Sequence, residues 1–332
     1  MFDLFLSRNE NDRMIDFGVG EPYVLQDAMK EVLDAIDPLC SMTYPKLGGE
    51  KGLLDELKEF TSKDKPYVFV ANGAKQALAA LFWAYKEKYG AKEVNHSTPY
   101  WLCYPTLAAS VGMEYRVYDP HDWEGVRVVT TPNNPDGSED LGEYDIADRA
   151  YGHWVWGATN FDPNAECFVY SAAKLYGCSG LRIGWGVCKD QGIADKAAQF
   201  VEIQTSGVCT MAQHHVAGIM REIRRRPALA KRWYKTARSG LETNAEVFNL
   251  QLRRYMTEVR GVPETGKGMF AFFKPENPDR FGRALSHTTI RLVSGEAFGP
   301  SYKGWYRMSM GHRPEFTAGA LETLYNCLEA TS

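Results

Sequence analysis

Short apolar runs rich in β-branched residues alternate with longer segments of helical periodicity along the first two thirds of the chain. The runs that predict strands are Tyr67–Val70, Lys92–Asn95, Tyr115–Tyr118, Val126–Thr130, Cys167–Tyr170 and Ile183–Cys188. Helical patterns separate some of them, over about 74–89 and 102–111. Strands that alternate with helices imply right-handed crossovers and a mostly parallel sheet, which binds ligands at the carboxyl ends of its strands.

The remainder of the chain has a different pattern. From about Ile193 to Asn249 it is almost wholly helical, and the last quarter returns to strands at Met269–Phe273, Thr289–Val293 and Trp305–Met310, before a helix near 316–330. We therefore expect an α/β fold with two domains. The large domain is expected over 35–238, and a small α+β domain is expected to join 1–34 to 239–332. A chain of 332 residues suits one such two-domain enzyme.

The composition excludes several classes of protein. A formal net charge of −4 gives no general reason to expect nucleic acid or an anionic membrane as a partner, and no uncharged apolar run approaches the length of a membrane span. The seven cysteines are dispersed, without a Cys-x-x-Cys pair, and the seven histidines form no metal-binding pattern. We expect a cytoplasmic protein with reduced thiols and no bound metal.

One stretch departs from this overall acidity. Between Arg221 and Arg238 the chain carries eight basic residues and one acidic residue, with Trp233 and Tyr234 among them. A solvated helical face accounts for such a pattern. The alternative is a surface for an anionic partner, or for a substrate linked to a nucleotide or nucleic acid, because Lys and Arg bind phosphates and aromatic rings stack on bases.

The surroundings of Lys174 indicate a chemistry. Ser171 lies three residues before it and Arg182 eight residues after it, in a stretch rich in small residues. A lysine that forms a Schiff base needs an uncrowded, partly desolvated pocket, and a phosphate beside it needs hydroxyl and guanidinium donors. Pyridoxal 5′-phosphate (PLP) requires that combination. The alternative is an exposed lysine in a loop rich in Gly and Ser.

Further segments stand in a consistent order along the chain: Asn72-Gly73-Ala74-Lys75 after a predicted strand, Pro99-Tyr100-Trp101, Asn133-Asn134-Pro135-Asp136-Gly137, and Asp148-Arg149-Ala150-Tyr151. With Ser171-x-x-Lys174 and Arg182, they resemble the motifs of the fold-type I, PLP-dependent aminotransferase superfamily, most nearly those of its alliinase and tryptophan-aminotransferase-related branch. The resemblance runs from about Phe17 to Met310. It implies a large domain with a mostly parallel sheet of the seven-stranded type between helices, a small α+β domain, and PLP as cofactor.

The resemblance implies which residues hold the cofactor's aldehyde and phosphate. Lys174 is the expected Schiff-base lysine and general acid–base, and Ser171 and Arg182 are the expected phosphate partners. The turn after the first predicted strand corresponds to the family's phosphate cup, where backbone N–H groups meet the positive end of a helix dipole. Its candidates are Gly73, Ala74 and Lys75.

The resemblance also implies the residues around the cofactor ring. Trp101 is expected to stack on the pyridine, with Tyr104 as second choice, although aromatic rings also pack in cores. Asn134 maps to the Asn that faces the phenolic oxygen, and Tyr151 is expected to bond the same oxygen. Asp148 maps to the carboxylate that keeps the pyridine nitrogen protonated, which makes the ring an electron sink.

Substrate and subunit contacts are implied in the same way. Arg307 resembles the Arg that pairs with the substrate α-carboxylate, and Gly20 and Asn134 are expected to border the substrate. Tyr44 resembles a Tyr that reaches the phosphate of the neighbouring subunit, which implies a homodimer with shared active sites. The alternatives are a surface salt bridge for Arg307 and a core position for Tyr44.

Two local features complete the comparison. Only about ten residues separate Gly137 from Asp148, where most relatives insert a helix and more, so we expect the sheet to be trimmed there. Trp154, three residues after Tyr151, resembles the Tyr-x-x-Trp of the alliinase-like branch.

The resulting hypothesis is an aminotransferase that acts on an L-amino acid and a keto acid. A decarboxylase or a β-eliminating lyase would use the same residues, because the pocket selects which bond the cofactor weakens. The amino acid in that alternative could be attached to a larger anionic molecule. A second alternative is a binding module with this fold that has lost catalysis, against which Lys174, Asp148 and Arg182 argue together.

Overall fold

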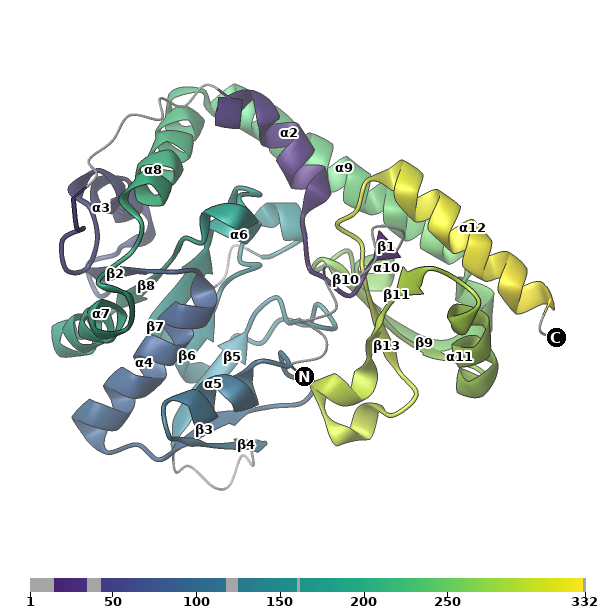
Figure 1. Cartoon of the computed structure of the whole chain (residues 1–332), viewed down its shortest axis with the longest axis horizontal. Coiled ribbons are helices and arrows are strands. Elements are labelled where there is room, and N and C mark those ends of the chain that lie inside the picture. Colours follow the sequence, from purple (N-terminus) through teal and green to yellow (C-terminus); the bar gives the residue numbers. More distant parts are fainter. Residues whose placement is uncertain (1–14, 35–42, 118–124, 160–161, 331–332) are drawn as a thin grey trace.

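In a computed structural model of the chain, residues 15–34, 43–117, 125–159 and 162–330 are described. They form a larger and a smaller part that lie side by side, with the long helix α9 (Pro227–Gln251) running from one to the other (Figure 1). The predicted domain ends 1–14 and 35–42, and Tyr118 at the end of a predicted strand, lie outside the described residues.

The larger part is built on a seven-stranded sheet. In spatial order its strands are β2 (Tyr67–Ala71), β8 (Gly184–Cys188), β7 (Asn164–Ser171), β6 (Glu143–Asp148), β5 (Val126–Thr130), β3 (Glu93–His96) and β4 (Glu114–Val117). Neighbouring strands are parallel except at β8, which runs antiparallel to both β2 and β7. The predicted α/β class and the mostly parallel sheet of seven strands are confirmed.

The expectation that this sheet is trimmed between Gly137 and Asp148 is wrong. β6 pairs with both β5 and β7, so the row of strands is complete. It is the connection that is short, because residues 131–142, all described, lead from β5 to the parallel β6 without a helix. In β5 the three valines are buried, whereas Arg127 is half-buried, and its Nε lies 3.4 Å from Asp145 Oδ2 on β6. Charged side chains can remain in contact with water, so the face of the sheet that carries this ion pair needs no helix to cover it.

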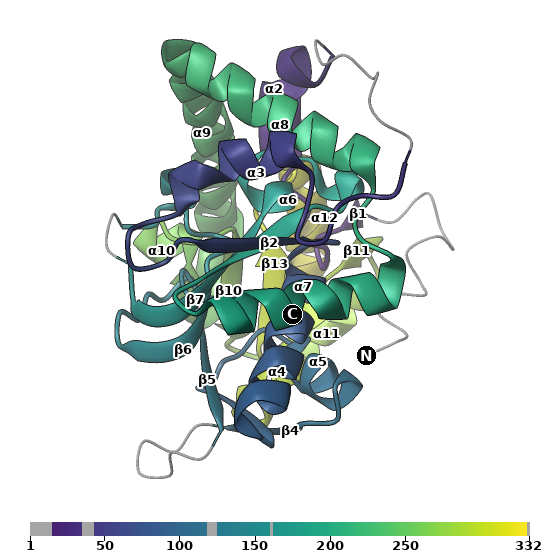
Figure 2. The ribbon, with the colours of Figure 1, turned by 90° about the vertical axis from the view of Figure 1, so that its left-hand side faces the viewer.

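Helices cover the rest of the large sheet on both faces. α4 (Ala74–Tyr89) and α7 (Gln191–Thr205) pack side by side on one face, and α3 (Lys51–Leu57) and α8 (Thr210–Arg225) lie on the other (Figure 2). Shorter elements connect the strands: η2 (Lys58–Phe60), α5 (Tyr104–Ser110), η3 (Trp154–Trp156), α6 (Ala172–Leu175) and η4 (Ser179–Leu181). The helix predicted over 74–89 is confirmed. It ends at Gly90, whose left-handed φ of 70° lets its N–H close the last turn on Lys86 O.

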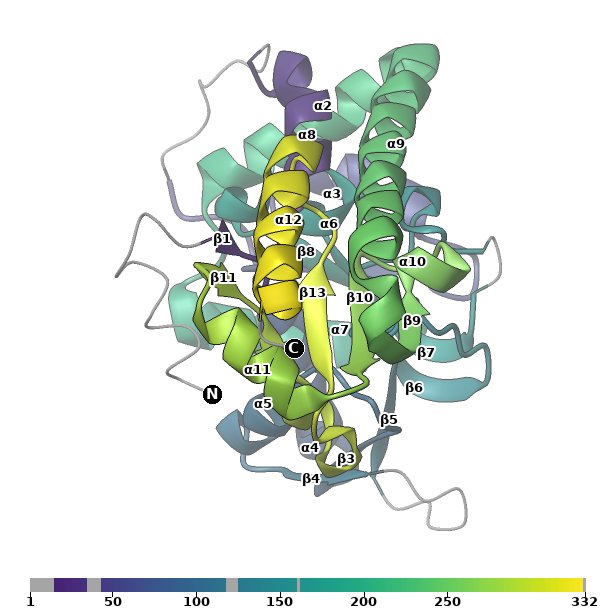
Figure 3. The same ribbon diagram turned by 90° about the vertical axis from the view of Figure 1, so that its right-hand side faces the viewer.

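The smaller part contains an antiparallel sheet and a two-stranded pair. The sheet has the order β12 (Val293–Ser294), β13 (Tyr306–Ser309), β10 (Phe270–Pro275) and β9 (Met256–Gly261), and β1 (Ile15–Asp16) pairs in parallel with β11 (Ile290–Arg291). α9 and α12 (Pro314–Ala330) lie side by side along it (Figure 3). The other elements are α2 (Tyr23–Asp34), η5 (Arg253–Tyr255), α10 (Val262–Thr265), α11 (Pro278–Ser286), η6 (Gly295–Phe298) and η7 (Pro300–Tyr302).

The N-terminal segment belongs with the C-terminal strands, as the predicted small domain requires. Besides the β1–β11 pair, Ser309 N donates a hydrogen bond to Phe17 O at 2.8 Å. The predicted boundary at 238 falls inside α9, so this division of the chain stays a prediction. No helix in the described part of the chain is long and apolar enough to span a membrane.

Candidate active site

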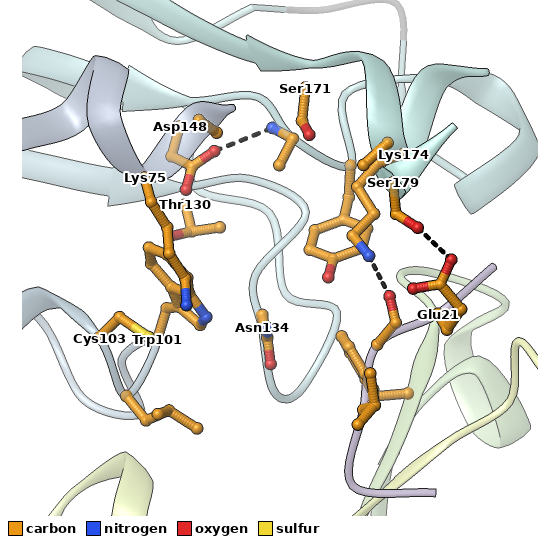
Figure 4. A pocket seen from close by; sticks show the side chains of 18 of the residues that line it. Glu21, Lys75, Trp101, Cys103, Thr130, Asn134, Asp148, Ser171, Lys174 and Ser179 are labelled. Carbon is orange, nitrogen blue, oxygen red and sulfur yellow. Dashed lines mark hydrogen bonds between the residues drawn. The ribbon is translucent and has the colours of Figure 1, made fainter. Parts of the chain in front are cut away.

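A cavity of about 600 Å³ lies where β5, β6 and β7 end, between the large sheet and the N-terminal segment 16–21 (Figure 4). Of the predicted site residues, all except Gly73 and Tyr44 line it. They are Gly20, Ala74, Lys75, Trp101, Asn134, Asp148, Tyr151, Ser171, Lys174, Arg182 and Arg307. Arg307 comes from β13 of the small domain, so both parts of the fold contribute to one cavity.

Lys174 extends into the cavity from the single-turn helix α6, which begins directly after Ser171 ends β7. Its Nζ donates a hydrogen bond to Gly20 O, on the opposite wall from Trp101 and Asp148 (Figure 4). The two residues between Ser171 and Lys174 are buried alanines, so little side-chain volume crowds the amine. The lysine is therefore half-buried, accessible and held in a fixed direction.

Asp148 is a buried acid at the end of β6, with only 3% of its surface exposed. Its Oδ1 accepts a hydrogen bond from Ala150 N at 2.9 Å, and its Oδ2 accepts one from Tyr104 Oη at 3.4 Å. Burial raises the pKa of this carboxyl from 3.8 to about 6. Asp148 makes no salt bridge with any described residue, so a cation in the cavity would find an unneutralised partner there.

The aromatic residues near this acid have different positions. Trp101 lines the cavity, with the Nζ of Lys75 at 5.6 Å from its ring centre (Figure 4). Tyr104, the second choice for stacking, is fully buried and meets Trp101 edge-on at 5.5 Å and 88°. Its hydroxyl bonds Thr130 Oγ1 at 2.6 Å as well as Asp148. Tyr104 thus supports the carboxylate from outside the cavity.

The start of α4 forms a narrow cradle with Arg182. Gly73 has a φ of 83°, and a Cβ placed on it would lie 2.6 Å from Arg182 Nη2. Across the sheet, a Cβ on Gly184 would lie 2.5 Å from Ala74 N. The first N–H groups of a helix have no intrahelical acceptor, and a helix dipole is positive at that end. With the hydroxyl of buried Ser171 nearby on the cavity wall, these groups suit an anion.

Arg307 is buried, which excludes the surface salt bridge that was its alternative. Its Nη1 donates to Asn134 Oδ1 at 2.7 Å and its Nη2 to Gly18 O at 2.5 Å, while its guanidinium carbon lies 4.2 Å from the centre of the Phe270 ring. Burial lowers its pKa to about 10, so it remains charged at neutral pH. These contacts fix the plane of the guanidinium, and its charge has no carboxylate partner among the described side chains.

Tyr151 lies between these groups. Burial raises the pKa of its hydroxyl, and the nearby Arg307 and a hydrogen bond with Asn134 oppose that shift. The ring is buried and meets Phe270 edge-on at 5.7 Å. The phenol is therefore neutral at physiological pH and can donate a hydrogen bond into the cavity.

Tyr44 lies elsewhere. It is 85% exposed, so the alternative of a core position is wrong, and its predicted contact with a neighbouring subunit stays a prediction. Three other apolar side chains are exposed on nearby segments: Leu47, Ile203 and Met211. The segment with Tyr44 and Leu47 contacts the α7–α8 connection between Ile203 and Met211, because a Cβ on Gly207 would lie 2.4 Å from Pro45 Cγ.

Several cavity residues were missed by the sequence analysis. Glu21, whose Oε1 accepts a hydrogen bond from Ser179 Oγ, follows Gly20 directly, so its place could have been inferred (Figure 4). Cys103 and Ser179 also line the cavity, and no motif marks them. Two other residues hold the turn that carries the lysine: Trp156 Nε1 donates to Lys174 O, and Tyr234 Oη donates to Leu175 O.

Two predicted surface features have other roles in the structure. Trp154 is 43% exposed, and it is its neighbour Trp156 that is buried near Lys174. In the basic segment, five cations pair with carboxylates of described residues: Arg221 and Arg224 with Glu56, Arg225 and Arg226 with Glu222, and Arg238 with Glu242. Trp233 and Tyr234 are buried and cannot stack on bases. Among the described residues, no group of three metal-binding side chains could hold an ion.

Comparison with known proteins identifies relatives of this architecture. A family profile described as Allinase matches residues 55–257. Tryptophan aminotransferase-related protein 2 of Arabidopsis thaliana is 26% identical over 246 residues, which cover 64% of this chain and 56% of that protein. An aspartate aminotransferase of Thermococcus kodakarensis is 24% identical over 353 residues, covering 93% of this chain and 88% of that protein.

Solved structures support the same assignment of the fold. The aromatic aminotransferase of Pyrococcus horikoshii OT3 superposes with a TM-score of 0.74, at 18% identity and with 99% of each chain covered. The chain spans about half the length of the tryptophan aminotransferase-related proteins that it matches. Because the Allinase profile covers more than half of the chain, this protein belongs to the allinase family, and it shares its fold with the aromatic aminotransferase.

Proposed function

We propose that this protein is a PLP-dependent aminotransferase, which moves the amino group of an L-amino acid to a keto acid with the cofactor attached at Lys174. The observation that carries this proposal is the meeting of three groups at one cavity: the Lys174 amine, the buried Asp148 carboxylate and the buried Arg307 guanidinium. An amine that can form an imine, a buried acid and a guanidinium that can bind a carboxylate suit amino-acid chemistry better than simple ligand binding.

The fit of the cavity to PLP supports the proposal. Arg182, Ser171 and the first turn of α4 would hold the phosphate, in the cradle that needs glycine at Gly73. Asp148 would accept the pyridine N–H, because a cation stabilises a buried carboxylate that makes no salt bridge with the described residues. Asn134 and Tyr151 would contact the phenolic oxygen. When bound, the cofactor supplies an electron sink that weakens the bonds at the substrate Cα.

Lys174 has a second task in this proposal, as the general acid–base. The side chain is half-buried, and its Nζ donates to Gly20 O on the wall opposite Trp101. A substrate would lie in the cavity between these two walls. The Nζ amine would take the proton from the substrate Cα and deliver it to the cofactor carbon bonded to the amino nitrogen.

Arg307 would orient the substrate. Its guanidinium is held by Asn134 and Gly18, and a bidentate contact with the α-carboxylate would fix the Cα–H bond relative to Lys174. Trp101 would stack on the cofactor ring. The orientation of the Cα bonds decides between amino transfer, decarboxylation and elimination.

The test separates these outcomes directly. The protein would be mixed with PLP, single amino acids and a keto acid acceptor, and new keto acid, CO2 and ammonia would be followed. Amino transfer that is lost in Lys174→Ala supports the proposal. CO2 without amino transfer would identify a decarboxylase, ammonia a lyase, and cofactor binding without any product a binding module.

We also propose a homodimer with shared sites, in which Tyr44 reaches the phosphate in the neighbouring subunit. The exposed Tyr44, Leu47, Ile203 and Met211 support it, because apolar side chains that gather on adjoining segments favour an interface. A cytoplasmic location is proposed as well. It is supported by the free thiols of the six cysteines in the described part of the chain.

A further inference from the structure

We infer that Trp156 and Tyr234 are positioning residues for Lys174, because they hold the backbone of the turn that carries the lysine and tie it to the small domain. The inference rests on the proposed role of Lys174. It adds two residues that contact neither the proposed cofactor nor the substrate, and that act through the lysine's main chain.

The turn itself has few internal restraints. α6 has only four residues, and the carbonyl groups of a helix's last turn have no intrahelical partner. Ala172 O accepts a hydrogen bond from Tyr176 N at 2.8 Å, which closes the turn. One such bond cannot offset the cost of ordering a turn, since helix nucleation is unfavourable. The position of Lys174 must therefore be fixed from outside α6.

Two buried aromatic side chains supply these restraints. Trp156 Nε1 donates to Lys174 O at 2.9 Å, and Tyr234 Oη donates to Leu175 O at 3.1 Å. Trp156 has no exposed surface and Tyr234 has 5%. Buried donors and carbonyls are costly when left unpaired, so each bond strongly favours one position of the turn.

Both donors belong to a structure that reaches the small domain. Gly268 N, in the loop before β10, donates to Trp156 O at 2.7 Å. One turn after Tyr234 on α9, Arg238 Nη1 donates to Gly266 O at 2.8 Å. Trp156 therefore joins the loop of the small domain, bonded at its main-chain carbonyl, to the carbonyl of Lys174, bonded at its indole N–H. A displacement of that loop reaches Lys174 through a single side chain.

The same ring also contacts Tyr151, another residue that lines the cavity. Trp156 meets Tyr151 edge-on, with ring centres 6.3 Å apart and an interplanar angle of 81°. A general base must lie within hydrogen-bonding distance of its proton, and a misplacement of about 1 Å can lower a rate roughly 100-fold. Loss of either donor should thus lower kcat more than it raises KM.

The test removes each hydrogen-bond donor and leaves an aromatic ring at its position. In Trp156→Phe and Tyr234→Phe, with Trp83→Phe on α4, where the ring packs against Phe200, as the control, three quantities are measured. They are the rate at which borohydride traps PLP on the protein, the pH midpoint of the absorption band of the attached cofactor, and kcat and KM. We expect trapping and kcat to fall roughly 10- to 100-fold, with a shifted midpoint and nearly unchanged KM. The control should behave as wild type.

The outcomes separate this inference from the proposed function. Wild-type protein that traps no cofactor on Lys174 overturns the proposed function and this inference with it. Wild-type trapping combined with wild-type rates and midpoints in both variants overturns the inference alone, even if the variants unfold at lower urea concentration. If Trp156→Phe does not fold, benzothienylalanine at that position removes the N–H and keeps the shape of the indole. The same fall in trapping and kcat is then expected, and wild-type values would again overturn the inference.

Discussion

Replacing Asp148 by Asn tests whether the cavity is built to receive a cation. The side chain is buried at the end of β6, and Asn preserves its shape and its hydrogen bond from Ala150 N. Burial raises the pKa of this carboxyl from 3.8 to about 6. The shift of about 2 units corresponds to about 3 kcal/mol, at 1.36 kcal/mol per unit.

The sign of the effect follows from which state holds the proton. Between pH 4 and pH 6 the unfolded chain has released the proton of Asp148, while the folded chain, with its raised pKa, still binds it. The contribution of Asp148 to the stability of the cofactor-free protein is therefore greatest below pH 4. It decreases by about 3 kcal/mol as the pH rises to about 6, and stays constant above that.

The assay is urea unfolding of the cofactor-free wild type and Asp148→Asn at several values between pH 4 and pH 7. The free energy of unfolding of wild type minus that of the variant should fall by about 3 kcal/mol over this range. Asp195→Asn, at an exposed position on α7, controls for the loss of one charge. At pH 7, bound PLP should raise the free energy of unfolding more in wild type than in Asp148→Asn, because only the carboxylate can pair with the protonated pyridine nitrogen. A difference that is the same at pH 4 and pH 7 would refute the reasoning.

Three further perturbations test other parts of the site. Arg307→Lys should raise KM for the amino acid roughly 10- to 150-fold, because losing one charge-assisted hydrogen bond costs about 1.5–3 kcal/mol, and steady-state kinetics with an unchanged KM would contradict its role. Gly137→Ala should destabilise the protein by about 2 kcal/mol or more in urea unfolding, since its φ is 69° and a Cβ would lie 2.3 Å from a backbone oxygen of the small domain. Its control, Gly319→Ala in α12, meets open space and should stabilise by about 0.5–1 kcal/mol; equal effects would count against the packing argument. Mixing Tyr44→Ala with Lys174→Ala should restore activity through hybrid dimers, and a monomer in sedimentation would exclude shared sites.

Residues in short local motifs were the most predictable part of the site. Ser171 and Lys174 are three residues apart across a strand-to-helix junction, so the local backbone alone brings both to the cavity. Asp148 ends β6, and the carboxyl ends of parallel strands meet at one edge of a sheet. The spacing of such residues along the chain fixes their place in space.

β9 and β6 are strands that the apolar pattern did not predict, and β6 shows the reason. It begins with Glu143, Tyr144 and Asp145, because one face of the strand has no helix over it and pairs its charges instead. A search for apolar runs misses such a strand, and the short connection before it then suggested a trimmed sheet. The short β5–β6 connection contains no helix, and the strand face that such a helix would have covered is therefore polar in sequence.

Tertiary contacts decided the remaining cases. Trp154 and Trp156 are two residues apart, and nothing local tells which is buried; the answer depends on Gly268 of the small domain, more than a hundred residues later. Tyr104 was a candidate for stacking on the cofactor, yet it is fully buried outside the cavity, where its hydroxyl donates to Asp148. In the basic stretch, two cations pair with Glu56 on α3, and no local pattern in the sequence places that carboxylate beside them.

The covalent attachment of PLP at Lys174 is the central claim, and chemical trapping measures it most directly. The full chain would be incubated with PLP, reduced with borohydride and digested, and the peptides would be mapped by mass. The account predicts one cofactor adduct on the peptide that contains Lys174, and none in Lys174→Ala. No adduct, or an adduct on another lysine such as Lys75, would contradict it.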